Sequence, residues 1–566
     1  MSPMSRIRNF IPPLSPELLL SRNFFELYPF DGGGSFIHRA MVGSVVDAEI
    51  ADAILNKDAL AAFGPLTEID FHSFDRWSAI EQSCWINRLY FIVPLARWAA
   101  LSGNRPAAEL VKGIILRFGA IYPPPANPAE VRELNRSIME ARDRDYNTAG
   151  PGFDAPICYQ WFDFQPASRV IHILHAVWFL RDMNVFSDED YAAVDRLLRE
   201  HARVIFQAND IGAKPKHGNH EALRALALLS CGILFQGEPD ASLWLDEGLR
   251  YSEAHILSDF LEDGMDTDLS PSYHFFETWI CRDADIYARR CNRPFSPAAQ
   301  ERLGRAFNIC RLFRLPNGLT PVVSDGYPLD MDTFCQTLPP TTEDGSERKE
   351  TLPNSGIAIR RNQTAYALFD ASPLLGRFAH YHAGKQAITL WFGNRPFVEE
   401  GGCCNYDDPA FSEFFKTAAA HASLLVDGKG DSQLEGRYCW LSSGTCRLSP
   451  WKGNTVSSTE TSPEWGNVTW TRTLTVDDTH ADIQDCIQNA EGREWSLLFP
   501  LAPEVTVTGS GNSLLLKNGD VAVEITAPSP IRIRQNRCVR NFKIVPTLCL
   551  EISGKGNAEL VTSFKM

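Results

Sequence analysis

One short stretch of the chain carries residues whose types and spacing could do chemistry. It contains three histidines and a pair of carboxylates: His380, His382, Glu399, Glu400 and His421. His380 and His382 are spaced i, i+2, which on a strand would place both imidazoles on the same face. The turn dipeptide Gly393-Asn394 can fold the following chain back as a hairpin. Such an arrangement can converge on a divalent metal and leave one histidine for proton transfer. The alternative is a set of ordinary, hydrogen-bonded hairpin histidines.

Two further polar segments interrupt apolar sequence earlier in the chain. Asn219-His220 stands directly before an apolar helical stretch, where backbone N–H groups and the helix dipole favour an anion. The segment 263–274 is acidic and polar and ends in Tyr273-His274. The simpler interpretations are a capping turn for the first segment and, for the second, a loop whose tyrosine packs at a helix start.

Helical periodicity dominates the sequence that must position these segments, from about residue 15 to residue 335. Ser15-Pro16, Ser187-Asp188 and Ser296-Pro297 each have the form of a helix start. Apolar residues recur at helical spacing over 110–118 and 223–233. Many successive helices predict an all-α layer, a bundle or a toroid of helical hairpins, over residues 1–335.

The sequence changes character after residue 335. Residues 336–355 are rich in proline, charge and small polar side chains, which predicts a linker. From residue 356 to 566 the period becomes two, for example along Val468–Val476, and Asn518-Gly519 predicts a hairpin. We therefore expect a C-terminal antiparallel β-sandwich.

The bulk composition excludes several classes of partner. The chain has 566 residues, 44% hydrophobic and 22% charged, as an ordinary multidomain globular protein has. Its formal net charge of -16 argues against nucleic acid and anionic membranes as partners, although a local basic pocket can still bind an acidic sugar.

Fourteen cysteines without a CxxC pair fit a reducing compartment. No signal peptide is visible, so we expect a cytoplasmic protein, or a periplasmic one if a leader was removed. The oligomeric state is not indicated.

The order of these motifs resembles that of the heparinase II/III-like polysaccharide lyases. Gly-Asn-His-Glu before a helix is followed by Asp-Gly and Ser-Pro-x-Tyr-His, then by His-x-His with a downstream acidic-Gly-Gly, then by Ala-His. The resemblance extends over roughly residues 160–430. Asp325-Gly326 resembles the family's loop before the linker, and Ser355–Arg360 its first β-domain strand. The family combines an (α/α) toroid with an antiparallel β-sandwich.

The resemblance implies β-elimination at a 4-linked uronic acid, giving a 4,5-unsaturated uronate end. Asn219, with His220 beside it, would neutralise the sugar carboxylate, and Tyr273 would protonate the leaving oxygen. His380 is the first choice of base for one C5 stereochemistry, Tyr273 could act as both base and acid for the other, and His220 is the second choice of base. The substrate would be a glycosaminoglycan or alginate, as polymer or oligosaccharide.

The implied metal site is a structural zinc ion held by His382, Glu399 and His421. Glu400 is an alternative to Glu399 because either precedes the glycines. Two positions depart from the family's pattern: Gly384 stands where Asp is usual, and Ala422 where Asn is usual. These differences weaken the metal and substrate assignments more than the proton-transfer assignments.

Two other functions stay open at this point. Toroid-plus-sandwich folds also occur in glycoside hydrolases, which need two carboxylates around the bond. The acidic residues Asp263, Asp266 and Asp268 could supply one, but no convincing partner is evident. The second alternative is a non-catalytic glycan-binding protein that keeps the fold and has lost the chemistry.

Overall fold

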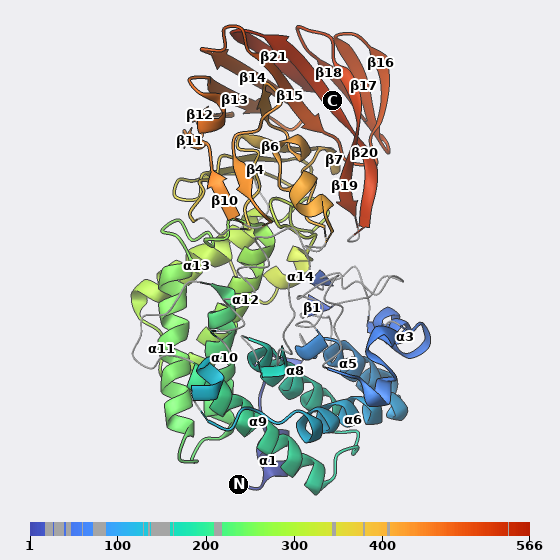
Figure 1. Ribbon diagram of the computed structural model, residues 1–566, viewed down its shortest axis with the longest axis vertical. Coiled ribbons are helices and arrows are strands. Elements are labelled where there is room, and N and C mark those ends of the chain that lie inside the picture. The colour runs from blue at the N-terminus through green and yellow to red at the C-terminus, as the bar shows by residue number, and fades with distance from the viewer. Residues whose placement is uncertain are drawn as a thin grey trace. The chain divides into compact units, whose positions relative to one another are not determined.

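The computed structural model of the protein (Figure 1) describes residues 1–16, 26–27, 39–40, 47–58, 60–71, 86–127, 129–133, 136, 159–161, 164–208, 218–341, 347–376, 380–404, 408–437, 439–540 and 543–566. Within these residues, no helix is both long enough and apolar enough to cross a bilayer. The chain divides into two compact units. Unit 1 comprises residues 1–259 and 276–303, and unit 2 comprises residues 260–275 and 304–566.

Unit 1 is helical in the residues that the structure describes, apart from the short pair β1 (Glu26–Leu27) and β2 (Arg39–Ala40). Its helices are α1 (Pro3–Arg8), α3 (Asp47–Asn56), α5 (Ile92–Ser102), α6 (Arg105–Ile121), α8 (Gln165–Leu180), α9 (Asp188–Ala208), α10 (Asn219–Leu234) and α11 (Ala241–Asp259). Every residue of α8 is buried, so this helix forms the middle of the unit. Helices α12 (Pro271–Arg290) and α13 (Pro297–Leu312) each contribute residues to both units.

Two of the predicted helix starts are confirmed and one is not described. Ser187 begins α9 with a reciprocal cap, in which its Oγ accepts from Asp190 N at 3.2 Å and the Asp190 carboxylate accepts from Ser187 N at 2.9 Å. Ser296 caps α13, whose first residue is Pro297. The predicted helix after Ser15-Pro16 lies beyond the described residues.

Besides residues of α12 and α13 and short helical turns, unit 2 contains antiparallel sheets and the short helix α14 (Met331–Cys335). A five-stranded sheet has the order β3 (Arg348–Leu352), β4 (Ile357–Arg361), β5 (Tyr366–Asp370), β6 (Ala387–Phe392) and β7 (Arg395–Val398). A four-stranded sheet has the order β19 (Arg532–Arg540), β20 (Lys543–Lys555), β15 (Glu494–Pro500) and β8 (Leu424–Val426). The strands β9 (Gln433–Glu435) and β10 (Cys439–Ser442) form a separate pair.

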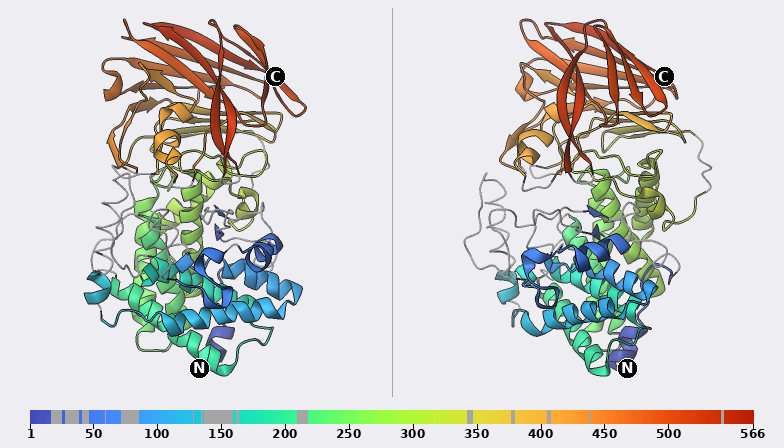
Figure 2. Two further views of the ribbon diagram at one scale, coloured as in Figure 1. Left: turned by 45° about the vertical axis from the view of Figure 1, so that its right-hand side comes forward. Right: turned by 90° about the vertical axis from the view of Figure 1, so that its right-hand side faces the viewer.

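The remaining sheet has eight strands, and Figure 2 gives two further views of it. Its order is β11 (Thr445–Leu448), β12 (Thr455–Thr461), β13 (Thr469–Val476), β14 (His480–Gln488), β21 (Ala558–Lys565), β18 (Val521–Thr526), β17 (Ser513–Asn518) and β16 (Thr506–Ser510). Burial alternates along β13 and β14, as expected for strands with one face on a core. One apolar cluster joins this sheet to the other two through residues such as Trp470, Leu497 and Ile388.

The predicted hairpins are confirmed. Gly393 and Asn394 connect β6 to β7 with φ of 55° and 65°, a pair of left-handed residues that suits a two-residue hairpin. Asn518-Gly519 lies at the tip between β17 and β18.

Three details of the expected organisation differ from the structure. Strand β3 lies inside the predicted linker 336–355, so Ser355–Arg360 leads into the second strand of the sheet and not the first. The expected helical domain 1–335 also loses residues 260–275 and 304–335 to unit 2. His380 and His382 precede β6 instead of lying on a strand. Each difference arises because packing, which periodicity does not report, decides where a segment belongs.

Candidate functional site

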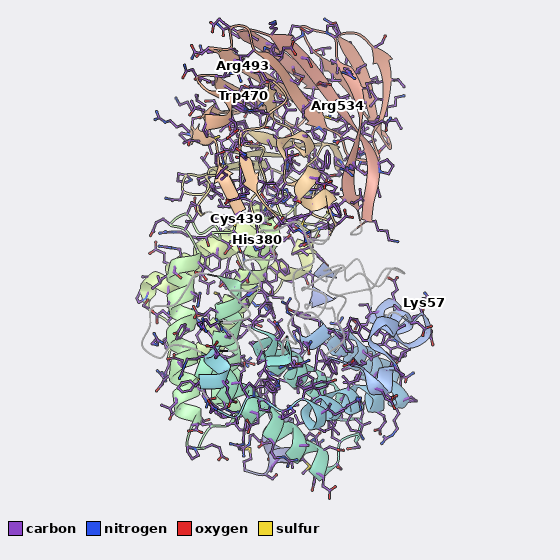
Figure 3. All side chains as sticks on the ribbon, viewed as in Figure 1. Lys57, His380, Cys439, Trp470, Arg493 and Arg534 are labelled. Atoms are coloured by element: carbon purple, nitrogen blue, oxygen red, sulfur yellow. The ribbon has the colours of Figure 1, made fainter. Side chains whose placement is uncertain are left out.

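Tyr273, His380 and Asp325 come together within unit 2, from three distant parts of the sequence. The ring of Tyr273 stacks on the imidazole of His380 with 3.8 Å between centroids and 22° between planes. On the other side, His380 Nδ1 lies 2.7 Å from Asp325 Oδ2. Figure 3 labels His380. A phenol, an imidazole and a carboxylate in contact are the components of a proton-transfer site.

Asp325 connects the two histidines of the His-x-His motif. Its second oxygen, Oδ1, lies 2.7 Å from His382 Nε2, and its backbone N–H donates to the carbonyl of His380 at 3.1 Å. Burial alone would favour the neutral acid, but the Lys416 ammonium and the two histidine contacts outweigh burial and hold the pKa of the Asp325 carboxyl well below its usual range. Asp325 is therefore an anion, and it orients both imidazoles.

Local contacts fix the backbone that carries Tyr273. Tyr273 lies in the first turn of α12, between two buried neighbours. Ser272 Oγ bonds to the backbone of Tyr327, and His274 Nε2 lies 3.0 Å from the Ala306 carbonyl. Burial lowers the pKa of His274 to about 4, so His274 is a neutral packing residue. Tyr273 and His380 remain partly exposed, while Asp325 is fully buried.

His382, Glu400 and His421 form a second, buried cluster next to Asp325. Their side chains are at most 4% exposed, and the rings of His382 and His421 lie 5.4 Å apart. His421 Nδ1 contacts Glu400 Oε2, and its Nε2 bonds to the carbonyl of Phe415 at 2.9 Å. Burial opposes a charge on His421, but Glu400 outweighs burial and raises the pKa of His421. Glu400 therefore favours the protonated form of His421.

The geometry and the donor atoms of this cluster bear differently on metal binding. Among the described residues, no group of three or more His, Cys, Asp and Glu side chains is arranged to hold a metal. The donor chemistry nevertheless fits zinc. Burial lowers the pKa of His382 to about 4, and its Nδ1, like Glu400 Oε1, is buried without a hydrogen-bond partner in the described part of the chain. His421 bonds to the backbone through Nε2, so Nδ1 is the atom that could bind zinc, after losing the proton that Glu400 favours.

Glu399, the first choice of carboxylate, does not join this cluster. Its side chain pairs with Arg540 at the end of β19, and its backbone N–H donates to Pro500. Neighbouring residues on an extended segment point to opposite sides, so only one of Glu399 and Glu400 can face His421. Glu400, the alternative that the sequence left open, is therefore the carboxylate that contacts His421.

The two departures from the family's pattern have packing explanations. Gly384 has a φ of 126°, and a Cβ added there would lie 2.6 Å from the Cβ of His421, so a larger residue would displace that histidine. Its N–H donates to Asp431 Oδ1 at 2.8 Å. Ala422 is fully buried, and its carbonyl accepts a 2.6 Å hydrogen bond from Arg472 Nη1.

Asn219 and His220 lie in unit 1, at the start of α10. Asn219 is the first residue of the helix and is 9% exposed. The imidazole of His220 packs on the ring of Phe164 with 4.0 Å between centroids, and the guanidinium of Arg88 lies 4.0 Å from the same ring. The Asn-His motif is thus at a helix N-terminus, as its sequence predicted.

Two of the acidic residues considered for a hydrolase, Asp263 and Asp266, accept hydrogen bonds from the backbone. The Asp263 carboxylate accepts from the backbone of Asn354 and Ser355, each at 2.8 Å, and thereby holds the turn before β4. Asp266 Oδ1 accepts from the backbone N–H of Asp268 at 2.9 Å.

Two functional candidates escaped the sequence analysis. In the sequence, Asp325 is visible only as part of the Asp325-Gly326 loop. The position of this dipeptide between helical and β sequence is the one signal that could indicate a site residue. Lys416 carries no motif, and it is fully buried although it is a lysine. Burial lowers the pKa of Lys416, while Asp325 opposes that effect.

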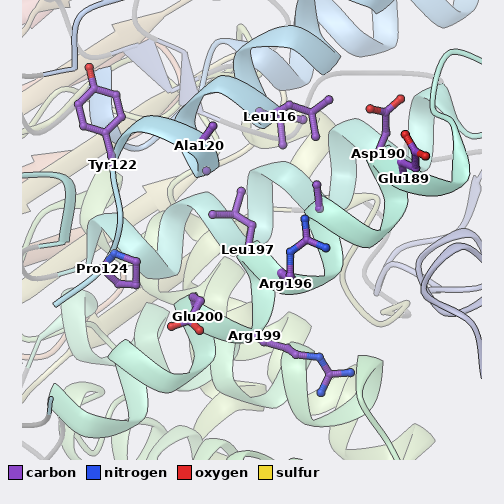
Figure 4. Close-up of a pocket in the computed structure, with 13 residues that line it drawn as sticks. Leu116, Ala120, Tyr122, Pro124, Glu189, Asp190, Arg196, Leu197, Arg199 and Glu200 are labelled. Carbon is purple, nitrogen blue, oxygen red and sulfur yellow. The ribbon is translucent and has the colours of Figure 1, made fainter. Parts of the chain in front are cut away.

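Of two pockets in the described residues, one is lined by Lys416 and the other lies in unit 1. A pocket of about 420 Å³ in unit 2 is bordered by Lys416 and Trp440 together with small polar side chains. Another, of about 560 Å³, lies between α6 and α9 in unit 1 (Figure 4). Its lining includes Leu116, Leu197 and Arg196, and none of the predicted site residues.

Comparison with solved structures identifies the fold. Heparinase III superposes with a TM-score of 0.72 at 14% identity, covering 99% of this chain and 88% of that one. Heparan sulfate lyase HepC from Pedobacter heparinus gives 0.59 at 15% identity, with coverage of 93% and 83%. Chondroitin AC lyase from Streptomyces coelicolor A3 gives 0.53 at 10% identity, with coverage of 92% and 78%. The predicted combination of a helical N-terminal part and an antiparallel β C-terminal part is confirmed.

Sequence comparison identifies the family. A heparin-sulfate lyase from Pedobacter heparinus is 23% identical over 244 residues, which are 38% of this chain and 37% of that protein. The aligned region thus spans little more than a third of this relative. The heparinase II/III N-terminus model matches residues 155–343, and the heparinase II/III-like C-terminal model matches residues 344–565. Together the two models cover most of the chain, which belongs to the heparinase II/III-like family.

Proposed function

We propose that this protein is a polysaccharide lyase that cleaves a 4-linked uronic-acid glycan by β-elimination. The proposal depends mainly on one observation. The ring of Tyr273 stacks on the imidazole of His380, and Nδ1 of that imidazole contacts the Asp325 carboxylate. The relatives described above are heparin, heparan sulfate and chondroitin lyases, which supports a glycosaminoglycan as the substrate class.

The contacts of His380 suit it to act as the base. Since the Asp325 carboxylate accepts from Nδ1, the other ring nitrogen, Nε2, is the one that can take up the C5 proton. The resulting imidazolium is stabilised by the Asp325 anion, as the carboxylate of a catalytic triad stabilises its histidine. The C5 electron pair then forms the C4=C5 double bond, and the bond from C4 to the bridging oxygen breaks.

Tyr273 suits the role of acid. Its hydroxyl can donate a proton to the departing oxygen, which becomes the hydroxyl of a new reducing end. For the opposite C5 stereochemistry we assign both proton transfers to Tyr273. The neutralisation of the sugar carboxylate is assigned to Asn219 and His220, as the family resemblance implies; His220 remains the second choice of base.

Ultraviolet absorbance of the unsaturated product tests the proposal. Wild type and Tyr273→Phe are incubated with heparan sulfate, chondroitin sulfate, hyaluronan and alginate oligosaccharides. We expect absorbance to rise with one substrate and turnover by the variant to fall roughly 10²-fold or more. Tyr366→Phe is the matched control, because the Tyr366 hydroxyl is buried in the same unit without a hydrogen-bond partner in the described residues.

Each failure has a distinct meaning. Near-normal turnover by Tyr273→Phe would remove Tyr273 from the mechanism. New reducing ends without absorbance would establish hydrolysis. Absence of both products with every substrate would favour a glycan-binding protein.

We further propose a structural zinc ion held by His382, Glu400 and His421. A bound zinc would compensate the buried Glu400 charge and tie the segment before β6 to the segment before β8. Elemental analysis of the purified protein should give about one zinc per chain. Removal by a chelator should lower the thermal midpoint, and Glu400→Gln should lose the metal whereas Glu399→Gln should retain it. Protein that is purified without zinc and does not bind added zinc would refute the site.

A further inference from the structure

A buried charged cluster connects helix α11 to the start of helix α10. His255 and Asp259, both on α11, are 0% and 1% exposed. His255 Nδ1 lies 2.6 Å from Asp259 Oδ2, and His255 Nε2 lies 3.3 Å from Glu221 Oε2 on α10. Asp259 Oδ2 also accepts a 3.1 Å hydrogen bond from the backbone N–H of Gly218. The cluster therefore contacts α10 at two points.

These two points enclose the Asn-His motif. Gly218 immediately precedes Asn219, and Glu221 immediately follows His220. Gly218 is the N-cap of α10, has a φ of 127° and provides no side-chain cap. The carboxylate of Asp259 accepts from the N-cap N–H, which is the contact that an N3 carboxylate makes in a capping box, but it does so from the neighbouring helix. Asn219 and His220 are thus held on both sides from the neighbouring helix.

Close helix packing keeps α11 in register with α10. A Cβ added at Gly248 of α11 would lie 2.5 Å from the backbone nitrogen of Leu229, and one added at Gly232 of α10 would lie 2.6 Å from that of Leu245. Two such close approaches leave the helices little freedom to slide. The end of α11 that carries His255 and Asp259 is consequently fixed beside the first turn of α10.

The charges around His255 favour its protonated form. It faces Asp259 on its own helix, Glu221 on α10 and Glu277 on α12, and its ring stacks near Tyr251. Burial opposes protonation, but the carboxylates outweigh burial and raise the pKa of His255 to about 9. A protonated imidazole can donate from both nitrogens and therefore bridge the two carboxylates.

We propose that the His255–Asp259 pair is a positioning device for the proposed lyase reaction, which sets the orientation of Asn219 and His220 by holding the residues on either side of them. This inference rests on the proposed function. His255 and Asp259 do not touch the substrate in this assignment. They act through the backbone of Gly218 and the side chain of Glu221.

The test compares His255→Gln and Asp259→Asn with His175→Gln. His175 is also a buried helical histidine of unit 1, but its Nδ1 contacts the Ile171 carbonyl of its own helix. Displacement of a substrate-orienting group costs roughly 10²-fold in rate, so we expect kcat of His255→Gln to fall by about that factor with a smaller change in KM. The alkaline limb of the wild-type kcat profile near pH 9 should also disappear in this variant, and His175→Gln should retain wild-type kcat.

Asp259 variants separate positioning from folding. An Asn side chain can still accept from Gly218 N–H, whereas Ala cannot, so Asp259→Asn should retain more kcat than Asp259→Ala when both have similar thermal midpoints. If His255→Gln and Asp259→Ala keep wild-type kcat and pH profile, the pair is only structural and the inference is wrong. If wild type itself yields no unsaturated product, the proposed function fails, and this inference fails with it.

Discussion

At the scale of single residues, Asp325 is the side chain on which the candidate site depends. It contacts the base candidate His380 and the metal-ligand candidate His382 with its two oxygens. A carboxylate in this place selects the tautomer of each imidazole and stabilises the imidazolium that forms on proton transfer. The sequence motifs indicate the two histidines but not Asp325, which orients them.

We predict that Asp325→Asn lowers kcat roughly 10²- to 10⁴-fold, because an amide can favour the wrong histidine tautomer. Steady-state rates of unsaturated-product formation measure the effect. Asp263→Asn is the control, since Asp263 is a carboxylate of the same unit whose hydrogen bonds go to Met265, Asn354 and Ser355. Equal rates for the two variants would show that Asp325 has no special role.

At the scale of elements, a buried ion pair inside the β-sandwich supports the segments of the site. Arg472 on β13 and Asp485 on β14 are both 0% exposed and lie 2.8 Å apart. The Arg472 guanidinium also donates to the carbonyls of Gln386 and Ala422. These two residues adjoin the segments of His382 and His421, so the sheet interior holds both segments in place.

We predict that Arg472→Met lowers the free energy of unfolding by about 3–5 kcal/mol, because it leaves the Asp485 charge buried and unpaired. The double variant Arg472→Met/Asp485→Leu should lose less free energy of unfolding than this single variant, because no buried charge is left unpaired. Denaturant unfolding measures both. Arg395→Met, which breaks the exposed pair with Asp520, should change stability by at most about 1 kcal/mol. A double variant that is less stable than Arg472→Met would contradict the prediction.

At the scale of the whole molecule, the stability of unit 1 should depend on the protonation of His255. In unit 1 the pKa of His255 is raised from 6.5 to about 9, so folding favours its protonated form. The resulting stabilisation is fully present below about pH 6.5 and is lost as pH rises through about 9. This shift corresponds to roughly 3 kcal/mol of stability.

Hydrogen exchange followed by mass spectrometry can test this pH dependence. Between pH 6.5 and 9, after correction for intrinsic exchange rates, protection of peptides from α10 and α11 should decline in wild type. In His255→Gln it should remain nearly constant over this range. Peptides from β13 and β14 in unit 2 serve as an internal control, because the buried charges there are not shared with His255. An equal decline in the variant would refute the assignment to His255.

Local patterns in the sequence were sufficient for the fold class, the hairpins and several helix starts. Helical and strand periodicity depend on which face of an element is buried, and caps and hairpin turns depend on backbone geometry over a few residues. Ser187, Gly393-Asn394 and Asn518-Gly519 therefore had the roles that their sequence predicted. The motifs also led to the family and to Tyr273 and His380 as candidates.

Only the tertiary structure decided which side chains meet. Asp325 lies 55 residues from His380 along the chain, and the choice of Glu400 over Glu399 depends on which way an extended segment faces. The sequence shows Gly384 only as a departure from the family's pattern, whereas the structure shows that a side chain at this position would collide with His421. Contacts between distant segments arise from packing of the whole unit, and no local pattern encodes them. For that reason the sequence by itself determined the elements and the candidates, and the folded chain determined the site.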